Sequence, residues 1–353
     1  MLYSASSSAT GSIGPALSHA LDSRQNNYNA VRLLAAAMVI ISHAFLVLRP
    51  GEDVEPLSWA AYDLGATAVN MFFVLSGVMV SRSYDRNPDI RRFVIARLLR
   101  IYPGLVVAAI VTTVVIGPLS TELPPMVYFA DVATWTYHLR VLYDFAGATI
   151  PTIFTGNIDP GTNESLWTIK YELLAYGCFV ALVWLGLLRR QWTVEIICVS
   201  AGVLLVTPLG VVEDGAGAGI HLVRFVFAFS AGMLAYRHAA RLRLSLPVAV
   251  IGVAAALIMG QAPGATAVSI LAFGYAALVL GSVEALVPAY FRRHDFSYGL
   301  YLYGWPVQQG ISHHIAWDGF WIFGHIALAL VISGGLAAAS WFWIERQALA
   351  LKR

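Results

Sequence analysis

Apolar segments long enough to cross a lipid bilayer follow one another along most of this chain. A membrane-spanning helix needs roughly 17–25 apolar residues. Only 12% of the residues are charged and 58% are hydrophobic, whereas soluble domains carry about 25% charged residues. The sequence therefore predicts an all-α membrane protein, a polytopic bundle of about ten transmembrane helices. These helices are expected near residues 30–48, 62–81, 95–117, 166–188, 194–212, 219–237, 246–261, 265–284, 297–316 and 320–344.

The basic residues give these helices an orientation. Arginine clusters such as 91–92, 189–190 and 292–293 follow every second predicted segment, whereas the alternate loops hold only Arg49 and Arg140. Cytoplasmic loops of membrane proteins are enriched in Lys and Arg. Both termini are therefore predicted to be cytoplasmic. The net charge of +2 is too small to indicate nucleic-acid binding, and anionic membrane lipids are the expected partners of the basic loops.

Two regions differ in character from the apolar segments. Residues 1–27 are small and polar and predict a flexible N-terminal tail, which leaves 28–353 as the transmembrane domain. The loop at about 118–165 is long and rich in aromatic and turn residues, so it forms either an ordered cap or a passive connection. Cys178 and Cys198 lie in apolar runs without metal-type spacing, and no metal site is predicted.

The first apolar segment carries Arg32 and, eleven positions later, His43. Eleven helical residues turn through three turns plus about 20°, so the two side chains share one face and are separated by about 16 Å of rise. Arg32 by itself is equally explained as a cation that reaches the lipid headgroups. His43 by itself is explained by a hydrogen bond to a neighbouring helix.

Other charged residues point to a polar interior. Arg97 and Arg100 share a helical face at the cytoplasmic end of the third segment, where guanidinium groups bind either anionic lipid or a phosphate ligand. Glu172 lies about two turns inside the fourth segment, and a carboxylate at such a depth is either functional or paired, with Arg224 as the structural alternative.

Considered in order, the motifs Arg32-x10-His43, FFVLSG (72–77), RLLRIYP (97–103), LWTIKYE (166–172), SYGLYLYGWP (297–306) and SWFWIE (340–345) resemble the membrane-bound acyltransferase-3 family. The resemblance covers roughly residues 27–353. The chain departs from the family pattern at Trp305, where a small or polar residue is usual, and at Thr168, where serine is common. The resemblance implies transfer of an acyl group from cytoplasmic acyl-CoA to a hydroxyl of an extracytoplasmic polysaccharide or cell-envelope glycan, in the inner membrane of a bacterium. Acetyl is the expected group, and succinyl is the alternative.

This resemblance assigns expected roles to the residues. Arg32, Arg97 and Arg100 are expected to hold the phosphates of acyl-CoA, and Ser76, Trp167 and Tyr298 to contact substrate. An imidazole is suited to take the proton from a sugar hydroxyl, so His43 is the expected general base, with Glu172 fixing its tautomer. A transient acyl-His43 is the alternative mechanism.

Two other classes of function fit the same sequence. A transporter or flippase for a small anionic or lipid-linked substrate would line its path with Arg32, Glu172 and Arg224. A non-catalytic membrane subunit of a glycan assembly complex would keep its function without His43. The sequence does not indicate the acyl group, the acceptor or the oligomeric state.

Overall fold

The structure is a computed structural model that describes residues 14–23, 25–48, 55–207, 217–284, 286–315 and 321–352. Regular secondary structure in these ranges is helical, apart from two isolated bridge pairs. The elements are α1 (Leu17–Asp22), α2 (Tyr28–Leu48), α3 (Leu64–Arg86), α4 (Ile90–Val111), η1 (Thr112–Ile116), α5 (Gly117–Leu119), α6 (Pro125–Ala130), α7 (Val132–Asp144), η2 (Phe145–Gly147), η3 (Glu164–Thr168), α8 (Ile169–Trp184), η4 (Leu187–Arg189), α9 (Thr193–Val206), α10 (Gly217–Arg237), α11 (Leu246–Met259), α12 (Ala265–Ser282), α13 (Ala289–Arg293), α14 (Ser297–His314), α15 (Ile322–Ser340), η5 (Trp341–Glu345) and α16 (Arg346–Ala350).

The all-α prediction is confirmed, and each predicted segment contains a helix. Among the described residues, seven helical segments are long and apolar enough to cross a membrane. α9 and α11 have only 14 residues each, and α14 is not among the seven, so the count of about ten stays a prediction. The seven segments are Tyr28–Leu48, Leu64–Arg86, Ile90–Leu119, Glu164–Trp184, Gly219–Arg237, Ala265–Ser282 and Ile322–Ala350.

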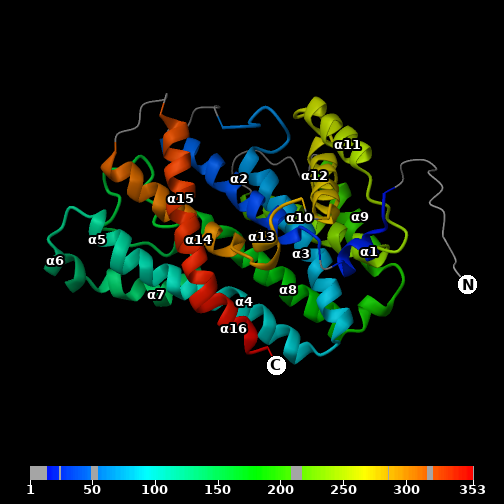
Figure 1. Ribbon diagram of the computed structural model, residues 1–353, viewed down its shortest axis with the longest axis horizontal. Helices are drawn as coiled ribbons and strands as arrows, with labels where there is room; N and C mark the ends of the chain where they lie inside the picture. Colours follow the sequence, from blue (N-terminus) through cyan, green and yellow to red (C-terminus); the bar gives the residue numbers. More distant parts are fainter. Residues whose placement is uncertain are drawn as a thin grey trace, which may run out of the picture.

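Arginines gather at one end of the bundle, which we call the basic end. α3 ends there at Arg86, and α10 ends there at Arg237. The first and last described helices also lie at this end, because Asp22 of α1 pairs with Arg86 and α16 packs against α4 (Figure 1). The cytoplasmic location of this end is the prediction made from the loop charges.

Close packing of α3 against α10 forms the centre of the bundle. A Cβ atom added to Gly77 would lie 2.1 Å from the carbonyl oxygen of Phe229, and one added to Gly232 would lie 2.1 Å from that of Val74. Small residues allow membrane helices to approach closely, and these two glycines face each other. Gly77 of the FFVLSG motif therefore has a packing role.

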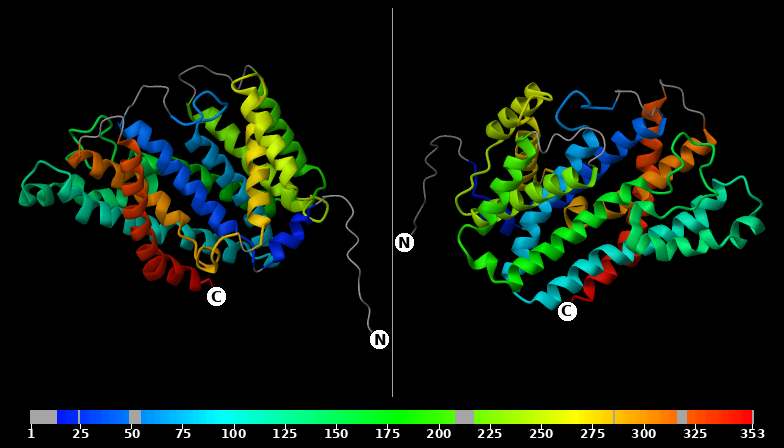
Figure 2. Two further views of the ribbon diagram at one scale, coloured as in Figure 1. Left: turned by 45° about the horizontal axis from the view of Figure 1, so that its top comes forward. Right: turned by 180° about the vertical axis from the view of Figure 1, so that it is seen from behind.

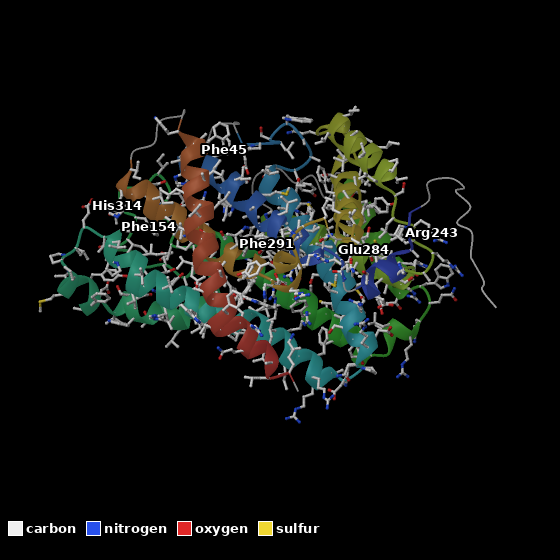
Figure 3. The ribbon with its side chains drawn as sticks, viewed as in Figure 1. Phe45, Phe154, Arg243, Glu284, Phe291 and His314 are labelled. Carbon is white, nitrogen blue, oxygen red and sulfur yellow. The ribbon has the colours of Figure 1, made fainter. Side chains whose placement is uncertain are left out.

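The long connection between α4 and α8 is ordered and carries helices of its own. α5, α6 and α7 project from one side of the bundle in Figure 1, and the remainder of the connection runs back to α14. Asn157 donates to the Gln309 carbonyl at 2.9 Å, and Asn163 donates to that of Leu302 at 2.9 Å. Phe154, labelled in Figure 3, is fully buried. The connection is therefore an ordered element attached to α14.

α1, in the described part of the predicted N-terminal tail, packs against the bundle. Leu17 and Leu21 of α1 are buried, and the Leu17 amide donates to the Leu242 carbonyl at 2.9 Å. α1 contacts α12 and α10 (Figure 2). The apolar residues among the small polar ones stabilise this short helix against the bundle. Residues 1–13 lie outside the described residues.

Candidate active site

Side chains from α2, α3, α4, the η3–α8 segment and α14 enclose a cavity of about 120 Å³, which we call the arginine cavity. Six residues predicted from the sequence line it, although they come from distant parts of the chain. These are Arg32, Ser76, Arg97, Arg100, Glu172 and Tyr298.

A buried carboxylate, Asp295, joins two of the three arginines. It accepts hydrogen bonds from Arg32 Nη1 and, at 2.7 Å, from Arg100 Nη2. The Ser297 hydroxyl and amide complete its shell at 2.5 and 3.2 Å. Burial by itself raises the pKa of Asp295, but the charges of Arg100 and Arg32 and the Ser297 hydrogen bonds outweigh it and lower the pKa to about 2. Asp295 therefore stays ionised and fixes both guanidinium groups.

A second buried carboxylate, Glu345, lies near the other side of Arg100. Its Oε2 is 3.8 Å from Arg100 Nη1, and the Ser340 hydroxyl donates to its Oε1 at 2.9 Å. Glu345 ends the π-helical turn η5, a local widening of the helix that is frequent at functional sites. Arg100 therefore lies between two buried acidic side chains.

Arg97 differs from its two neighbours because it has no ion pair with any residue that the structure describes. Its guanidinium lies 5.5 Å from the ring centre of Phe93 and 5.6 Å from that of Tyr176. Aromatic faces stabilise such a cation without neutralising it. Of the three cavity arginines, Arg97 is therefore the one with an uncompensated charge for an anionic ligand.

Glu172 lies in the cavity wall as the partner of Tyr176, whose hydroxyl donates to Glu172 Oε1. Ser76 Oγ lies 3.5 Å from the same tyrosine hydroxyl. The motifs of the second and fourth predicted segments therefore meet through one tyrosine. Glu172 is not the residue that contacts the His43 imidazole.

His43 lies beyond the cavity, where its Nδ1 is 3.4 Å from Ser165 Oγ. The Tyr301 hydroxyl donates to the Ser165 carbonyl, so the 2.6 Å contact between Tyr301 and Thr168 requires Thr168 to be the donor. Thr168 and Tyr301 both line the arginine cavity. A chain of polar groups therefore connects the cavity wall to the imidazole.

Trp305 covers another side of His43. The two rings meet edge to face with 5.0 Å between their centres, and Trp305 Nε1 donates to the Gly161 carbonyl at 2.8 Å. Gln309 binds the same loop by donating to the Asp159 carbonyl at 2.7 Å. Trp305, the departure from the expected pattern, thus attaches the long connection to α14 next to the imidazole.

These groups define what the site is able to do. The guanidinium groups at one end suit phosphate oxygens, which they bind through paired N–H donors. The imidazole at the other end is a proton acceptor near neutral pH. Among the described residues, no group of three or more His, Cys, Asp or Glu side chains forms a metal site.

Comparison with known proteins identifies the family of the chain. A family model described as an acyltransferase domain matches residues 25–346. The chain belongs to the acyltransferase-3 family. Nodulation protein 10 of Rhizobium leguminosarum bv. viciae is 29% identical to this acyltransferase, and the match covers 96% of this chain and 97% of that protein. An O-acetyl transferase of Shigella phage Sf6 is 26% identical, over 92% of this chain and 96% of the relative. No solved structure matches the chain.

Two of the predicted site residues of the acyltransferase lie outside the cavity wall. His43 is reached through Ser165, and Trp167 packs against His221, with 4.7 Å between the ring centres. The predicted Glu172–His43 pair does not form, because Glu172 pairs with Tyr176 one helical turn along α8. The alternative partner Arg224 instead donates to Asn70 Oδ1 at 2.7 Å and to the Ala66 carbonyl at 2.7 Å.

Sequence reasoning missed Asp295, Glu345 and Ser165. Asp295 lies two residues before the SYGLYLYGWP motif, Glu345 is the last residue of SWFWIE, and Ser165 directly precedes LWTIKYE. Their positions within or beside these motifs are therefore the sequence feature that could have identified them.

Proposed function

We propose that this integral membrane acyltransferase moves an acyl group from cytoplasmic acyl-CoA to a hydroxyl of an extracytoplasmic polysaccharide or cell-envelope glycan. Acetyl is the proposed group, with succinyl as the alternative. The observation that carries the proposal is the arginine cavity with its polar connection to His43. One site thereby contains guanidinium groups that suit phosphate and an imidazole that accepts a proton. The O-acetyl transferase among its relatives supports acetyl transfer to oxygen.

The proposed donor site uses the arginines unequally. Arg97 has the uncompensated charge and binds a donor phosphate, whereas Asp295 holds Arg32 and Arg100 in position beside it. The rise from Arg32 to His43 is about 16 Å, which suits an extended pantetheine arm that reaches from the phosphates to the imidazole. The basic end is then the cytoplasmic side, and the protein lies in the bacterial inner membrane.

The proposed reaction uses His43 Nε2 as the base. Because Nδ1 faces the Ser165 hydroxyl, a proton on Nδ1 leaves the Nε2 lone pair free. Nε2 takes the hydroxyl proton of the acceptor, the alkoxide oxygen bonds to the thioester carbonyl carbon, and the carbon–sulfur bond breaks. The thiolate of CoA then accepts the proton, so that the ester and free CoA are the products. Ser165 takes the orienting role that the sequence assigned to Glu172.

The test uses the full-length protein in vesicles with labelled acetyl-CoA and succinyl-CoA, and measures CoA release and ester formation. His43→Ala should abolish transfer without weakening donor binding, and Arg97→Ala/Arg100→Ala should weaken donor binding. His314→Ala and Arg91→Ala are matched controls, since both side chains are exposed (Figure 3 labels His314).

Three outcomes would contradict the proposal. Undiminished turnover in His43→Ala would show that His43 is not the general base. Recovery of acyl-His43 after an acid quench would favour the covalent alternative. Ion-coupled flux without donor binding would favour the transporter.

A further inference from the structure

A second cavity, of about 820 Å³, opens at the basic end and shares no lining residue with the arginine cavity. Residues from α1, the C-terminal part of α3, the α8–α9 region and the end of α10 surround it. We call it the basic vestibule, because Arg82, Arg86, Arg189 and Arg237 line it against only two lining carboxylates, Asp22 and Asp85.

An aromatic stack separates the two cavities. Tyr84 and Phe179 line the basic vestibule, Tyr176 lines the arginine cavity, and Phe93 lies between them. The centre of the Phe93 ring lies 5.2 Å from that of Phe179 and 6.4 Å from that of Tyr176. The vestibule is therefore a separate compartment with an aromatic wall of its own.

One carboxylate oxygen supplied by α1 holds two of the vestibule arginines. Asp22 Oδ1 lies 2.7 Å from Arg86 Nη2 and 3.1 Å from Arg82 Nη2. The pKa of Asp22 is lowered, first by the hydrogen bond from Arg82. Two guanidinium groups that converge on a single oxygen anion form the arrangement that also binds a phosphate oxygen.

The remaining cations differ in their compensation. Arg237 pairs with Glu195 at 3.2 Å, whereas Arg189 has no ion pair with any residue that the structure describes. The Tyr236 hydroxyl donates to Asp85 at 2.8 Å. Arg189 thus adds an uncompensated charge to the lining of the vestibule.

α1, which supplies Asp22, is held independently of this ion pair. The Leu17 and Ser18 amides donate to carbonyls of the α10–α11 connection at 2.9 and 3.1 Å, and Arg243 of that connection is labelled in Figure 3. The matched family model begins at residue 25, after α1. Asp22 is therefore a feature of this chain that its family model does not include.

We propose that the basic vestibule is a second binding site, for a phosphate group carried by a soluble nucleotide or by an anionic lipid, and that Asp22 occupies the place of one phosphate oxygen when the site is empty. The proposal goes beyond acyl transfer and does not depend on it. An arriving phosphate displaces the carboxylate from Arg82 and Arg86, so that Asp22 sets the threshold concentration for binding.

The test measures binding to the full-length protein in phosphatidylcholine nanodiscs by calorimetry, with adenosine 3′,5′-bisphosphate as the soluble probe. A parallel arm adds phosphatidylglycerol and counts retained lipid molecules by native mass spectrometry. Asp22→Asn should tighten binding by about threefold, because it removes an exposed competing ion pair. Arg82→Gln/Arg86→Gln should weaken binding by at least about tenfold, because it removes two charge-assisted donors.

Arg243→Gln is the matched control, since its side chain is exposed at the same end and lines neither cavity. Tighter binding of either probe by Asp22→Asn supports the site, and the probe that responds identifies the source of the phosphate. Unchanged binding of both probes in Asp22→Asn and in the Arg82/Arg86 double variant would overturn the proposal. Loss of binding only in Arg97→Gln/Arg100→Gln would also overturn it, since the phosphate would then lie in the arginine cavity.

Discussion

Arg100 and Asp295, which lie 195 positions apart, form an ion pair inside the bundle, with 2.7 Å between Nη2 and Oδ2. The two side chains are only 11% and 9% exposed. Arg32 reaches the same carboxylate oxygen from α2. The geometry of two arginines in the cavity wall therefore depends on one acidic residue that precedes α14.

Replacing Asp295 should damage donor binding and stability together. Removing one partner of a buried ion pair costs about 3–5 kcal/mol, because the other charge stays buried without compensation. In Asp295→Asn we expect the KM for the proposed acyl-CoA donor to rise more than kcat falls, together with a lower Tm. Asp89→Asn is the control, since Asp89 pairs with Arg92 on the surface at 3.9 Å. An unchanged KM and Tm in Asp295→Asn would show that the arginines are held by other contacts.

The same carboxylate predicts a loss of stability in acid. Its pKa falls from an ordinary 3.8 to about 2 in the folded protein, so its contribution is complete above pH 3.8 and disappears as the pH falls through about 2. The contribution is on the order of 2 kcal/mol. Thermal unfolding between pH 5 and pH 2 should show a steeper decline for the wild type than for Asp295→Asn. Parallel curves for the two proteins would contradict this prediction.

Ser165→Ala tests the orientation of His43. Without the Ser165 hydroxyl, Nδ1 loses its polar contact, and the fraction of imidazole with a free Nε2 should fall. We expect kcat to drop about fivefold while the KM for the donor stays constant, because one hydrogen bond contributes about 1 kcal/mol. Ser120→Ala is a matched control, since the Ser120 hydroxyl is buried without a described partner in the same connection. Equal kcat values for the two variants would show that Ser165 does not orient His43.

Trp305→Phe separates two roles of one side chain. Phenylalanine keeps an aromatic ring near His43 but cannot donate to the Gly161 carbonyl. The attachment of the long connection should weaken by about 1 kcal/mol. Limited proteolysis should then cut this connection faster, and the KM for the acceptor should rise with little change for the donor. Unaltered proteolysis would mean that the bonds from Asn163 and Gln309 suffice.

Gly77→Ala should separate α3 from α10. The added methyl group would lie 2.1 Å from the Phe229 carbonyl oxygen, which is part of the backbone and cannot turn away. Such overpacking costs typically about 1–3 kcal/mol, visible as a lower Tm and a lower yield of folded protein. Gly177→Ala is the control, because a Cβ there has nothing within 4 Å. Equal Tm values for both variants would contradict the close crossing.

The helices and most residues of the cavity wall could be predicted from the sequence, because the length of an apolar segment and the presence of a motif are local properties. Which acidic and basic side chains pair with one another could not be predicted from the sequence. Asp295 lies in a loop beside two arginines in the sequence, and only the fold brings it to Arg32, 263 positions away. The predicted Glu172–His43 contact is absent from the structure, where Tyr176, four residues along the same helix, donates to the Glu172 carboxylate. α1 was missed since six residues are too few for a periodic apolar pattern.

The placement of His43 also bears on the path between the two ends of the site. The imidazole is not among the residues that line the arginine cavity, and Trp305 packs against it beneath a loop tied to α14. Among the described residues, the hydroxyl groups of Thr168 and Tyr301 and the Ser165 backbone carbonyl join the two ends of the site. A substitution at Tyr301 would therefore act on the cavity wall and on the surroundings of His43 together.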